Sequence, residues 1–254
     1  MPKLSRITIY PIKSLDGVVV QSATVTSGGT FAHDREYAFF DSDGNVVNAK
    51  RTAKIQRIRA VFDEGLKSVT LSAQGEKATF ELGDSKLETW VSEYLGFRIT
   101  MHRNTQTGFP DDLNAWGATL VSEATYHEVN AWFRGISIEE LRQRFRTNLE
   151  LSECEPFWED RLCDEPPRTV PFQIGEVKIE GVNPCSRCVV PTRNPLSSEP
   201  TPKFQKHFSE TRNATLPVWA TREAFAHFYK LSVNTRIAKN QAGKIIRVGD
   251  ALQL

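Results

Sequence analysis

The chain has 254 residues, of which 39% are hydrophobic and 25% charged, a composition typical of a globular protein that argues against a disordered tail or a collagen-like repeat. Lys and Arg (32) against Asp and Glu (31) give a net charge of +1, so the overall charge does not indicate a nucleic-acid binder. No segment approaches the ~20 apolar residues of a membrane span, and the N-terminus lacks an apolar signal core. We therefore expect a cytoplasmic protein.

Segments rich in β-prone residues follow one another closely in the first part of the chain. Strands are predicted at Ile7–Tyr10, Val18–Val25, Glu36–Phe40, Asn45–Lys50, Arg57–Phe62 and Val69–Ser72. The sequence Asp41-Ser42-Asp43-Gly44 is typical of a turn and predicts a hairpin between the third and fourth of these strands. Strands at this spacing indicate a barrel or a sandwich.

Three amphipathic helices follow, each beginning at a serine. Ser85 and Glu88 form a capping-box pattern, and Gly96 is expected to end that helix. Ser122 is predicted to cap a helix that runs to about Phe133, and Ser137 a helix with Leu141 and Phe145 on one face. A fourth, weaker helix is expected after Thr221.

Between and after these helices the periodicity changes. Residues 104–116 have no regular pattern and are predicted to be a domain boundary or a long crossover. Later strands are expected at Asn148–Leu151, Val177–Gly181, Val189–Val190 and Lys244–Leu254, with a Pro-rich loop at Arg193–Pro202. The fold class is therefore mainly β with several helices, an α+β protein.

Two of the four cysteines stand at CxxC spacing in Cys185-Ser186-Arg187-Cys188. Such a pair can be two small buried residues, a redox pair, half of a metal site or one reactive thiolate beside a spectator. Zinc would need Cys154 and Cys163, which are spaced too widely for a usual second ligand pair. A thioredoxin-like role requires a helix start, whereas this motif lies among strands. Arg187 is expected to favour a thiolate.

Several basic residues stand where they would suit an anion. They are Lys13 beside Ser14, Arg35 after His33-Asp34, Lys50-Arg51, and Arg142, Arg144 and Arg146 at the end of a predicted helix. Guanidinium groups bind phosphate and carboxylate well. Taken singly, each is more often a solvated surface charge, and sequence spacing alone does not bring them together.

The order of the motifs along the chain resembles a known family. The motifs are Tyr10-Pro11-Ile12-Lys13-Ser14, Asp34-Arg35, Ser122-Glu123-Ala124, Phe145-Arg146-Thr147-Asn148, Glu159-Asp160, Cys185-Ser186-Arg187-Cys188 and Ile246-Arg247-Val248-Gly249-Asp250. Together they resemble the MOSC proteins, named for the C-terminal domain of molybdenum cofactor sulfurase, and most of all the mitochondrial amidoxime-reducing component and its bacterial counterparts.

The resemblance implies a fold and a site. It implies a β-barrel-like N-terminal domain at residues 1–105 packed on a β-barrel MOSC domain at residues 106–254. It implies a pyranopterin molybdenum cofactor, which recombinant protein can lack, with Cys188 as the catalytic residue and molybdenum ligand. The residues expected at the pterin and its phosphate are Lys13, Ser14, Arg35 and Arg146, with Asn148, Ser186 and Arg187 in neighbouring positions and Cys185 beside the ligand.

The function implied is an oxidoreductase that reduces N-hydroxylated or N-oxide compounds. Electrons are expected from a separate ferredoxin- or cytochrome-b5-like protein with its reductase, since no such domain is fused. No pyridoxal-phosphate domain is present either, so the chain alone is not expected to desulfurate cysteine. The alternatives are a non-catalytic carrier of the cofactor or of sulfur, as a persulfide on Cys188, and a zinc-stabilised β-domain. Neither nucleic acid nor a membrane span is expected.

Three positions depart from the family pattern. Pro191-Thr192 and Asn194-Pro195 replace a Thr-Thr and an Asp-Pro that relatives often carry after the second cysteine. Asn114 stands about where the animal relatives have an aspartate near the cofactor. These departures put proton delivery and substrate preference in question.

Overall fold

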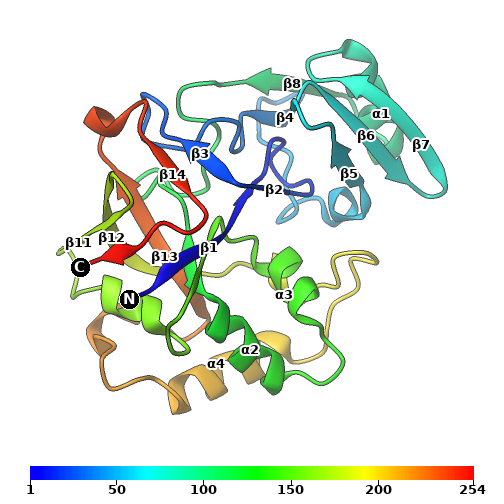
Figure 1. Ribbon diagram of the computed structural model, residues 1–254. Coiled ribbons are helices and arrows are strands. Elements are labelled where there is room, and N and C mark those ends of the chain that lie inside the picture. Colours follow the sequence, from blue (N-terminus) through cyan, green and yellow to red (C-terminus); the bar gives the residue numbers. More distant parts are fainter.

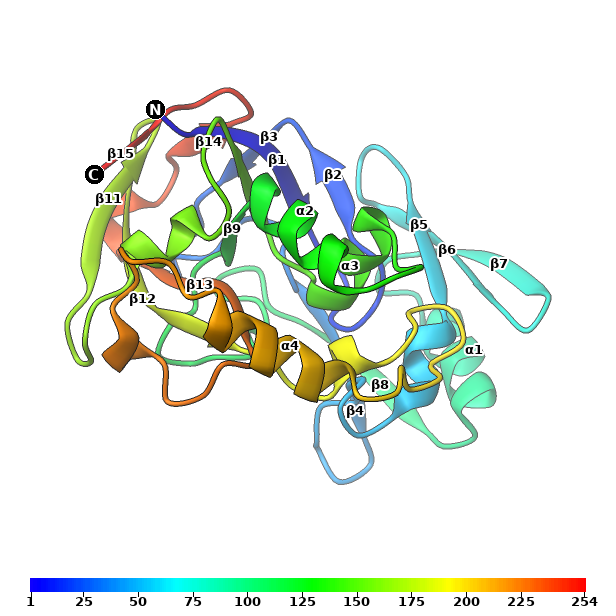
Figure 2. The same ribbon diagram turned by 90° about the horizontal axis from the view of Figure 1, so that it is seen from below.

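The computed structural model describes residues 1–254 and has fifteen strands and four α-helices (Figures 1 and 2). The strands are β1 Lys3–Ile9, β2 Val18–Val20, β3 Ser22–Thr24, β4 Tyr37–Asp41, β5 Arg59–Phe62, β6 Ser68–Ala73, β7 Glu76–Glu81, β8 Ile99–Arg103, β9 Leu120–Ser122, β10 Leu149–Ser152, β11 Val170–Ile174, β12 Val177–Ser186, β13 Lys230–Ile237, β14 Ile245–Arg247 and β15 Leu252–Gln253. The helices are α1 Ser85–Leu95, α2 Glu123–Trp132, α3 Ile138–Phe145 and α4 Phe204–Ala214. None of the helices is both long and apolar enough to cross a membrane.

The largest sheet joins both ends of the chain. Its strand order is β15-β11-β12-β13-β9-β10-β1-β2, and all of its neighbours are antiparallel except β9 and β10. A bridge between Lys3 and Ala251 brings the β15 end of the sheet alongside β1, so the sheet curls around its core. The predicted mainly β architecture with several helices is confirmed, although the sheets as paired do not form a closed barrel.

Three hydrophobic cores divide the interior. The first lies against the curled sheet and combines residues of β1, such as Leu4 and Ile7, with residues of the second half of the chain. The second consists of buried residues between Ile12 and Ile99, packed under β4, β8, α1 and the β5-β6-β7 sheet. The third packs α2, α3 and α4 together on one side of the large sheet, as Figure 2 shows. The division at residue 105 stays a prediction.

The helix starts follow local capping chemistry. Ser122 and Ser137 cap α2 and α3 as predicted, each side chain accepting a hydrogen bond from a backbone N–H of the first turn. Helix α1 begins one residue earlier than its capping box predicts, because the Asp84 carboxylate accepts from the Lys86 N–H. Gly96 ends α1 in a left-handed conformation (φ 88°), as predicted.

Five predicted elements differ from the structure, and the first two are predicted strands near the start of the chain. Asn45–Lys50 forms only a single bridge at Val46, because the Asn48 side chain accepts from the Lys50 N–H and turns the chain. The predicted strand Val18–Val25 is split into β2, which pairs with β1, and β3, which pairs with β14.

Of the other three, two are short 3₁₀ turns and one is an interrupted strand. Val189–Val190 leads into the turn Val190–Thr192, since Pro191 has no N–H for a strand ladder. After Thr221 only the turn Arg222–Ala224 forms, because the Thr221 side chain makes no capping hydrogen bond. The segment Lys244–Leu254, predicted as one strand, is interrupted between β14 and β15 by a turn at Gly249 (φ 97°).

Glu159 is a buried acid at the start of α2, and its protonation affects the stability of the fold. Glu159 is 1% exposed; its Oε2 accepts from the Ser122 N–H at 3.1 Å and the Thr125 hydroxyl at 3.0 Å, while Oε1 has no partner. Burial, reinforced by the neighbouring Asp160 carboxylate, raises the pKa of Glu159 well above its usual 4.5. The folded protein therefore binds an extra proton, and stability falls as pH rises from 4.5 through the raised pKa.

Glu159→Gln is expected to flatten this pH dependence and to stabilise the protein above neutral pH by about 1–3 kcal/mol, because the ionised carboxylate is no longer buried. Urea unfolding measured at intervals from pH 4.5 to pH 8.5 tests it. A variant whose free energy of unfolding keeps the wild-type dependence on pH would show that Glu159 is not the titrating group.

Candidate functional site

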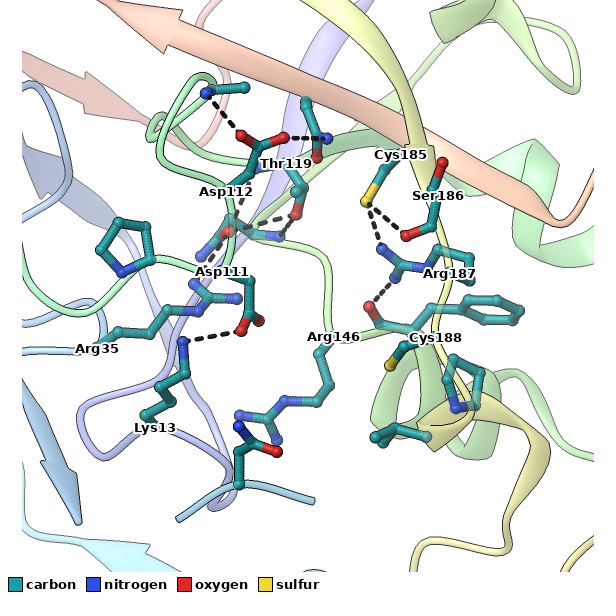
Figure 3. Close-up of a pocket in the computed structure, with 18 of the residues that line it drawn as sticks. Lys13, Arg35, Asp111, Asp112, Thr119, Arg146, Cys185, Ser186, Arg187 and Cys188 are labelled. Atoms are coloured by element: carbon teal, nitrogen blue, oxygen red, sulfur yellow. Dashed lines mark hydrogen bonds and ion pairs between the residues drawn. The ribbon is translucent and has the colours of Figure 1, made fainter. Parts of the chain in front are cut away.

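A pocket of about 670 Å³ lies where the second core meets the large sheet and the end of α3. Its walls come from the segment after β1, the segment Thr107–Thr119, the start of β10, the end of β12 and the residues after it. Every residue that the family resemblance assigns to the site lines it: Lys13, Ser14, Arg35, Arg146, Asn148, Ser186, Arg187 and Cys188. Of the other basic residues noted in the sequence, Lys50 and Arg144 line the pocket, whereas Arg51 and Arg142 do not. Figure 3 shows the basic residues on one side and the cysteine motif on the other.

Lys13 is held by a carboxylate that sequence reasoning missed. Its Nζ lies 2.8 Å from Oδ1 of Asp111 and donates to the Phe109 carbonyl at 2.8 Å. Burial lowers the pKa of Lys13, which Asp111 partly offsets. Burial by itself would raise the pKa of Asp111, but the positive charges of Lys13, Arg35 and Lys50 lower it to about 2. Asp111 lies in the segment 104–116, where the only available signal was its place between Pro110 and a second aspartate.

Arg35 and Asn148 form one hydrogen-bonded unit. Arg35 pairs with Asp34 at 2.5 Å and donates to Oδ1 of Asn148 at 3.3 Å. The same Asn148 oxygen accepts from the Thr119 N–H at 3.2 Å, and its amide nitrogen donates to the Thr8 carbonyl at 3.0 Å. Buried Asn148 therefore ties β1 to the β9–β10 region and fixes Arg35 at the pocket wall.

Arg146 is the pocket cation whose side chain makes neither an ion pair nor a hydrogen bond; Arg187 and Lys230, which also lack an ion pair, donate to carbonyl groups. It is the left-handed residue that ends α3, and its guanidinium carbon lies 4.2 Å from the centre of the Tyr10 ring. No hydrogen bond or ion pair joins it to the residues drawn in Figure 3, where it points into the pocket. Burial lowers its pKa. An enclosed guanidinium without a carboxylate is a site for an anionic ligand.

Tyr10 positions two of the cations. Its ring is contacted by Arg146 and, at 5.0 Å, by Arg35, and its hydroxyl donates to the Thr147 carbonyl at 3.1 Å. Burial raises the pKa of this phenol to about 12, so it stays neutral. Tyr10 is the first residue of the motif Tyr10-Pro11-Ile12-Lys13-Ser14, but the sequence predicted no role for it.

Three of the pocket residues have left-handed backbones although none is glycine. The φ angles are 74° at Ser14, 52° at Arg35 and 52° at Arg146. Residues other than glycine adopt this conformation rarely and at an energetic cost, and such residues cluster at ligand sites. Their coincidence around one pocket supports a binding role for it.

The cysteine motif forms the opposite wall. Cys185 and Ser186 are the last residues of β12, so the motif ends a strand and no helix begins there. Arg187 donates to Sγ of Cys185 at 2.9 Å and to the Phe145 carbonyl. Its direct contact is thus with Cys185, whereas the Cys188 thiol lines the pocket, half-buried and free.

The zinc interpretation does not fit the geometry. All four cysteines are free thiols, and no group of three or more His, Cys, Asp or Glu side chains is placed to hold a metal ion. Cys163 is buried and Cys154 packs against the first core, away from the pocket lining. A Cys₄ site is therefore absent, while a cofactor that brings its own metal needs only one protein thiolate.

The three departures from the family pattern lie in different places. Pro191 lines the pocket, and its carbonyl accepts from Arg144 at 2.7 Å. Asn194 is outside the lining and caps a turn in the predicted loop Arg193–Pro202, accepting from the Leu196 N–H at 2.9 Å. The carbonyl of Asn114 accepts from Arg236 at 2.8 Å, and its side chain is not part of the lining.

Comparison with known proteins shows which families the chain matches. The family of the MOSC N-terminal beta barrel domain matches residues 1–136, and the MOSC domain matches residues 117–253. Molybdenum cofactor sulfurase of Oryza sativa subsp. japonica is 25% identical over 234 residues, covering 73% of this chain and 27% of that protein. The tomato (Solanum lycopersicum) sulfurase is 24% identical, covering 98% of this chain and 35% of its own length.

Mitochondrial amidoxime-reducing component 1 of Homo sapiens is 24% identical over 236 residues, covering 76% of this chain and 66% of its own. The chain thus spans about a third or less of the two sulfurases and just under two thirds of the human protein. Because two family domains together cover almost all of its residues, the chain belongs to the MOSC proteins, with a MOSC N-terminal beta barrel domain followed by a MOSC domain.

Proposed function

We propose that the chain is a molybdenum-cofactor-binding oxidoreductase that reduces N-hydroxylated or N-oxide compounds with electrons from a separate protein. The observation that carries the proposal is that one pocket is lined both by a half-buried, unpaired guanidinium, Arg146, and by a free thiol, Cys188. A phosphorylated pterin that carries a metal needs both an anion site and a soft ligand. The relatives named for this cofactor and for amidoxime reduction support the proposal.

The residues present fit such a cofactor. Cys188 would ligate molybdenum, since thiolate is a soft donor and no other cysteine both lines the pocket and is free of a guanidinium contact. Arg146 would bind the phosphate, with Lys13, Ser14 and Arg35 around the pterin. Asn148 keeps Arg35 in place through its hydrogen bond, and Tyr10 supports both arginines.

When bound, the cofactor supplies a metal centre that takes an oxygen atom from the substrate in a two-electron reaction. The protein's contribution is binding and orientation. Arg187 spans from Cys185 to the Phe145 carbonyl and so fixes the turn that presents Cys188. The loop Arg193–Pro202 closes one side of the pocket, since Arg193 donates to the Ala49 carbonyl at 2.7 Å.

The test is metal analysis and an activity assay of wild-type protein made in a host that produces the molybdenum cofactor. We expect stoichiometric molybdenum, and reduction of an aromatic amidoxime by the loaded protein with chemically reduced viologen as donor. Bound molybdenum without turnover would replace the reductase with the cofactor carrier, and added sulfur on Cys188 in mass spectra would identify the persulfide carrier. Zinc, or neither metal, would overturn the proposal.

A further inference from the structure

Asp111 lies at the centre of the pocket's cations. Its Oδ1 is 2.8 Å from Nζ of Lys13 and 4.0 Å from Nζ of Lys50. Its negative charge also raises the pKa of Arg35 and of Arg146, against the lowering that burial causes in both arginines. No other carboxylate in the pocket forms ion pairs with two different cations of this group.

The segment that carries Asp111 is anchored on both sides. On one side Gly108 (φ 58°) approaches so closely that a Cβ there would lie 2.5 Å from the Asp34 carbonyl oxygen, and the Phe109 N–H donates to the Arg35 carbonyl at 2.9 Å. On the other side the Asp112 carboxylate accepts from the Asn114 N–H at 2.8 Å. Asp111 is therefore a built part of the pocket wall, although its side chain is 60% exposed.

The other cations of this wall are paired differently. Arg35 is paired by its sequence neighbour Asp34, and Arg59 by Asp16, which also accepts from the Ala60 N–H at 2.9 Å. These two carboxylates are fixed to the protein and half-buried or more. Asp111 reaches from an irregular segment toward the pocket lysines, and it is one carboxylate against several cations.

We propose, as an inference that rests on the function proposed above, that Asp111 is a selectivity residue of the cation-lined pocket wall: its carboxylate serves as an internal counter-ion for Lys13 and Lys50, with which a small entering anion must compete. Free phosphate or pyrophosphate has only the cations to bind and is disfavoured by repulsion from Asp111. A phosphate that is part of a larger molecule can still bind, since the contacts of that molecule with the rest of the pocket offset the repulsion from Asp111.

The experiment is calorimetric titration of the apoprotein with inorganic pyrophosphate at low salt. Asp111→Asn is expected to bind pyrophosphate about tenfold more tightly than the wild type, because one negative charge close to the ligand has been removed. Asp43→Asn is the matched control: it makes the same change of net charge at an exposed turn outside the pocket lining. It is expected to bind pyrophosphate as the wild type does.

Asp111→Ser also removes the carboxylate but introduces no amide group, and it is expected to bind pyrophosphate more tightly than the wild type as well. Thermal melting confirms that each variant is folded. Unchanged or weaker binding in both Asp111 variants would overturn the proposal, and so would an equal gain in Asp43→Asn or no pyrophosphate binding by any of the proteins. The titration needs no cofactor, so its failure is separate from a failure to find molybdenum in protein from a competent host.

Discussion

Replacing Cys188 with serine is expected to abolish molybdenum binding and, with it, reduction of N-hydroxylated compounds. Serine has nearly the same size, but its hydroxyl is a hard, poorly ionised donor in place of a soft thiolate. Changing a residue that only supports a metal ligand costs about 10–100-fold in metal affinity, so losing the ligand itself should cost more than about 100-fold. The half-buried thiol is free, so the fold should be unaffected.

Cys185→Ser is the control, because it makes the same chemical change three residues away. The Cys185 sulfur accepts from Arg187 at 2.9 Å, and a serine oxygen can accept as well, so most of the molybdenum should be retained. The measurements are molybdenum per chain and the rate of amidoxime reduction. Molybdenum retained in Cys188→Ser, or lost equally from both variants, would contradict the assignment of Cys188 as the ligand.

The parts of the fold that follow from local chemistry could be predicted from the sequence. Ser122, Ser137 and Gly96 mark helix ends because their side chains, or the lack of one, satisfy the backbone there. Helix α4 gave no such signal: its first turn follows Lys203 in a left-handed conformation, with no capping hydrogen bond. Its buried face, Phe204 and Phe208, is explained only by packing against α2 and α3.

Several strands were missed because tertiary pairing overrides their weak local pattern. β11 contains Pro171, whose missing N–H disfavours a strand, yet β15 pairs only with Gln173 and Ile174 and leaves Pro171 free of that ladder. β13 does alternate, with Leu231, Val233 and Ile237 between the polar Ser232, Asn234 and Arg236, and this signal was overlooked. β7 is an edge strand with charged residues at both ends.

The site shows the same boundary between local and long-range information. Lys13, Arg146 and Cys188 are far apart in the chain, and only the family resemblance indicated that they belong together; the structure brings them to one pocket. Neither Asp111 nor the role of Tyr10 could be predicted, because each depends on a contact across more than ninety residues. The bonding of Arg187 to Cys185 rather than Cys188 likewise follows from side-chain direction, which spacing does not give.

Arg146→Gln is expected to weaken retention of the cofactor by about 10–100-fold, since a charge-assisted hydrogen bond contributes about 1.5–3 kcal/mol. The Arg146 side chain makes neither an ion pair nor a hydrogen bond, so its charge is free for the ligand, whereas Arg35 and Lys13 already have carboxylates. Glutamine keeps a donor but loses the charge and the contact with Tyr10. The measurement is molybdenum content after gel filtration at low and high salt.

Exposed Arg134, in the turn between α2 and α3, offers a control with the same change of net charge. Arg134→Gln should retain molybdenum at both salt concentrations. The wild type should lose more cofactor at high salt than at low salt, because ions screen the attraction of a partly open pocket for phosphate, and Arg146→Gln should show a smaller salt dependence because the attracting charge is gone. Equal retention by Arg146→Gln and the wild type would place the phosphate elsewhere, at Lys13 or Arg35, and would remove the main reason for regarding the unpaired guanidinium as the anion subsite.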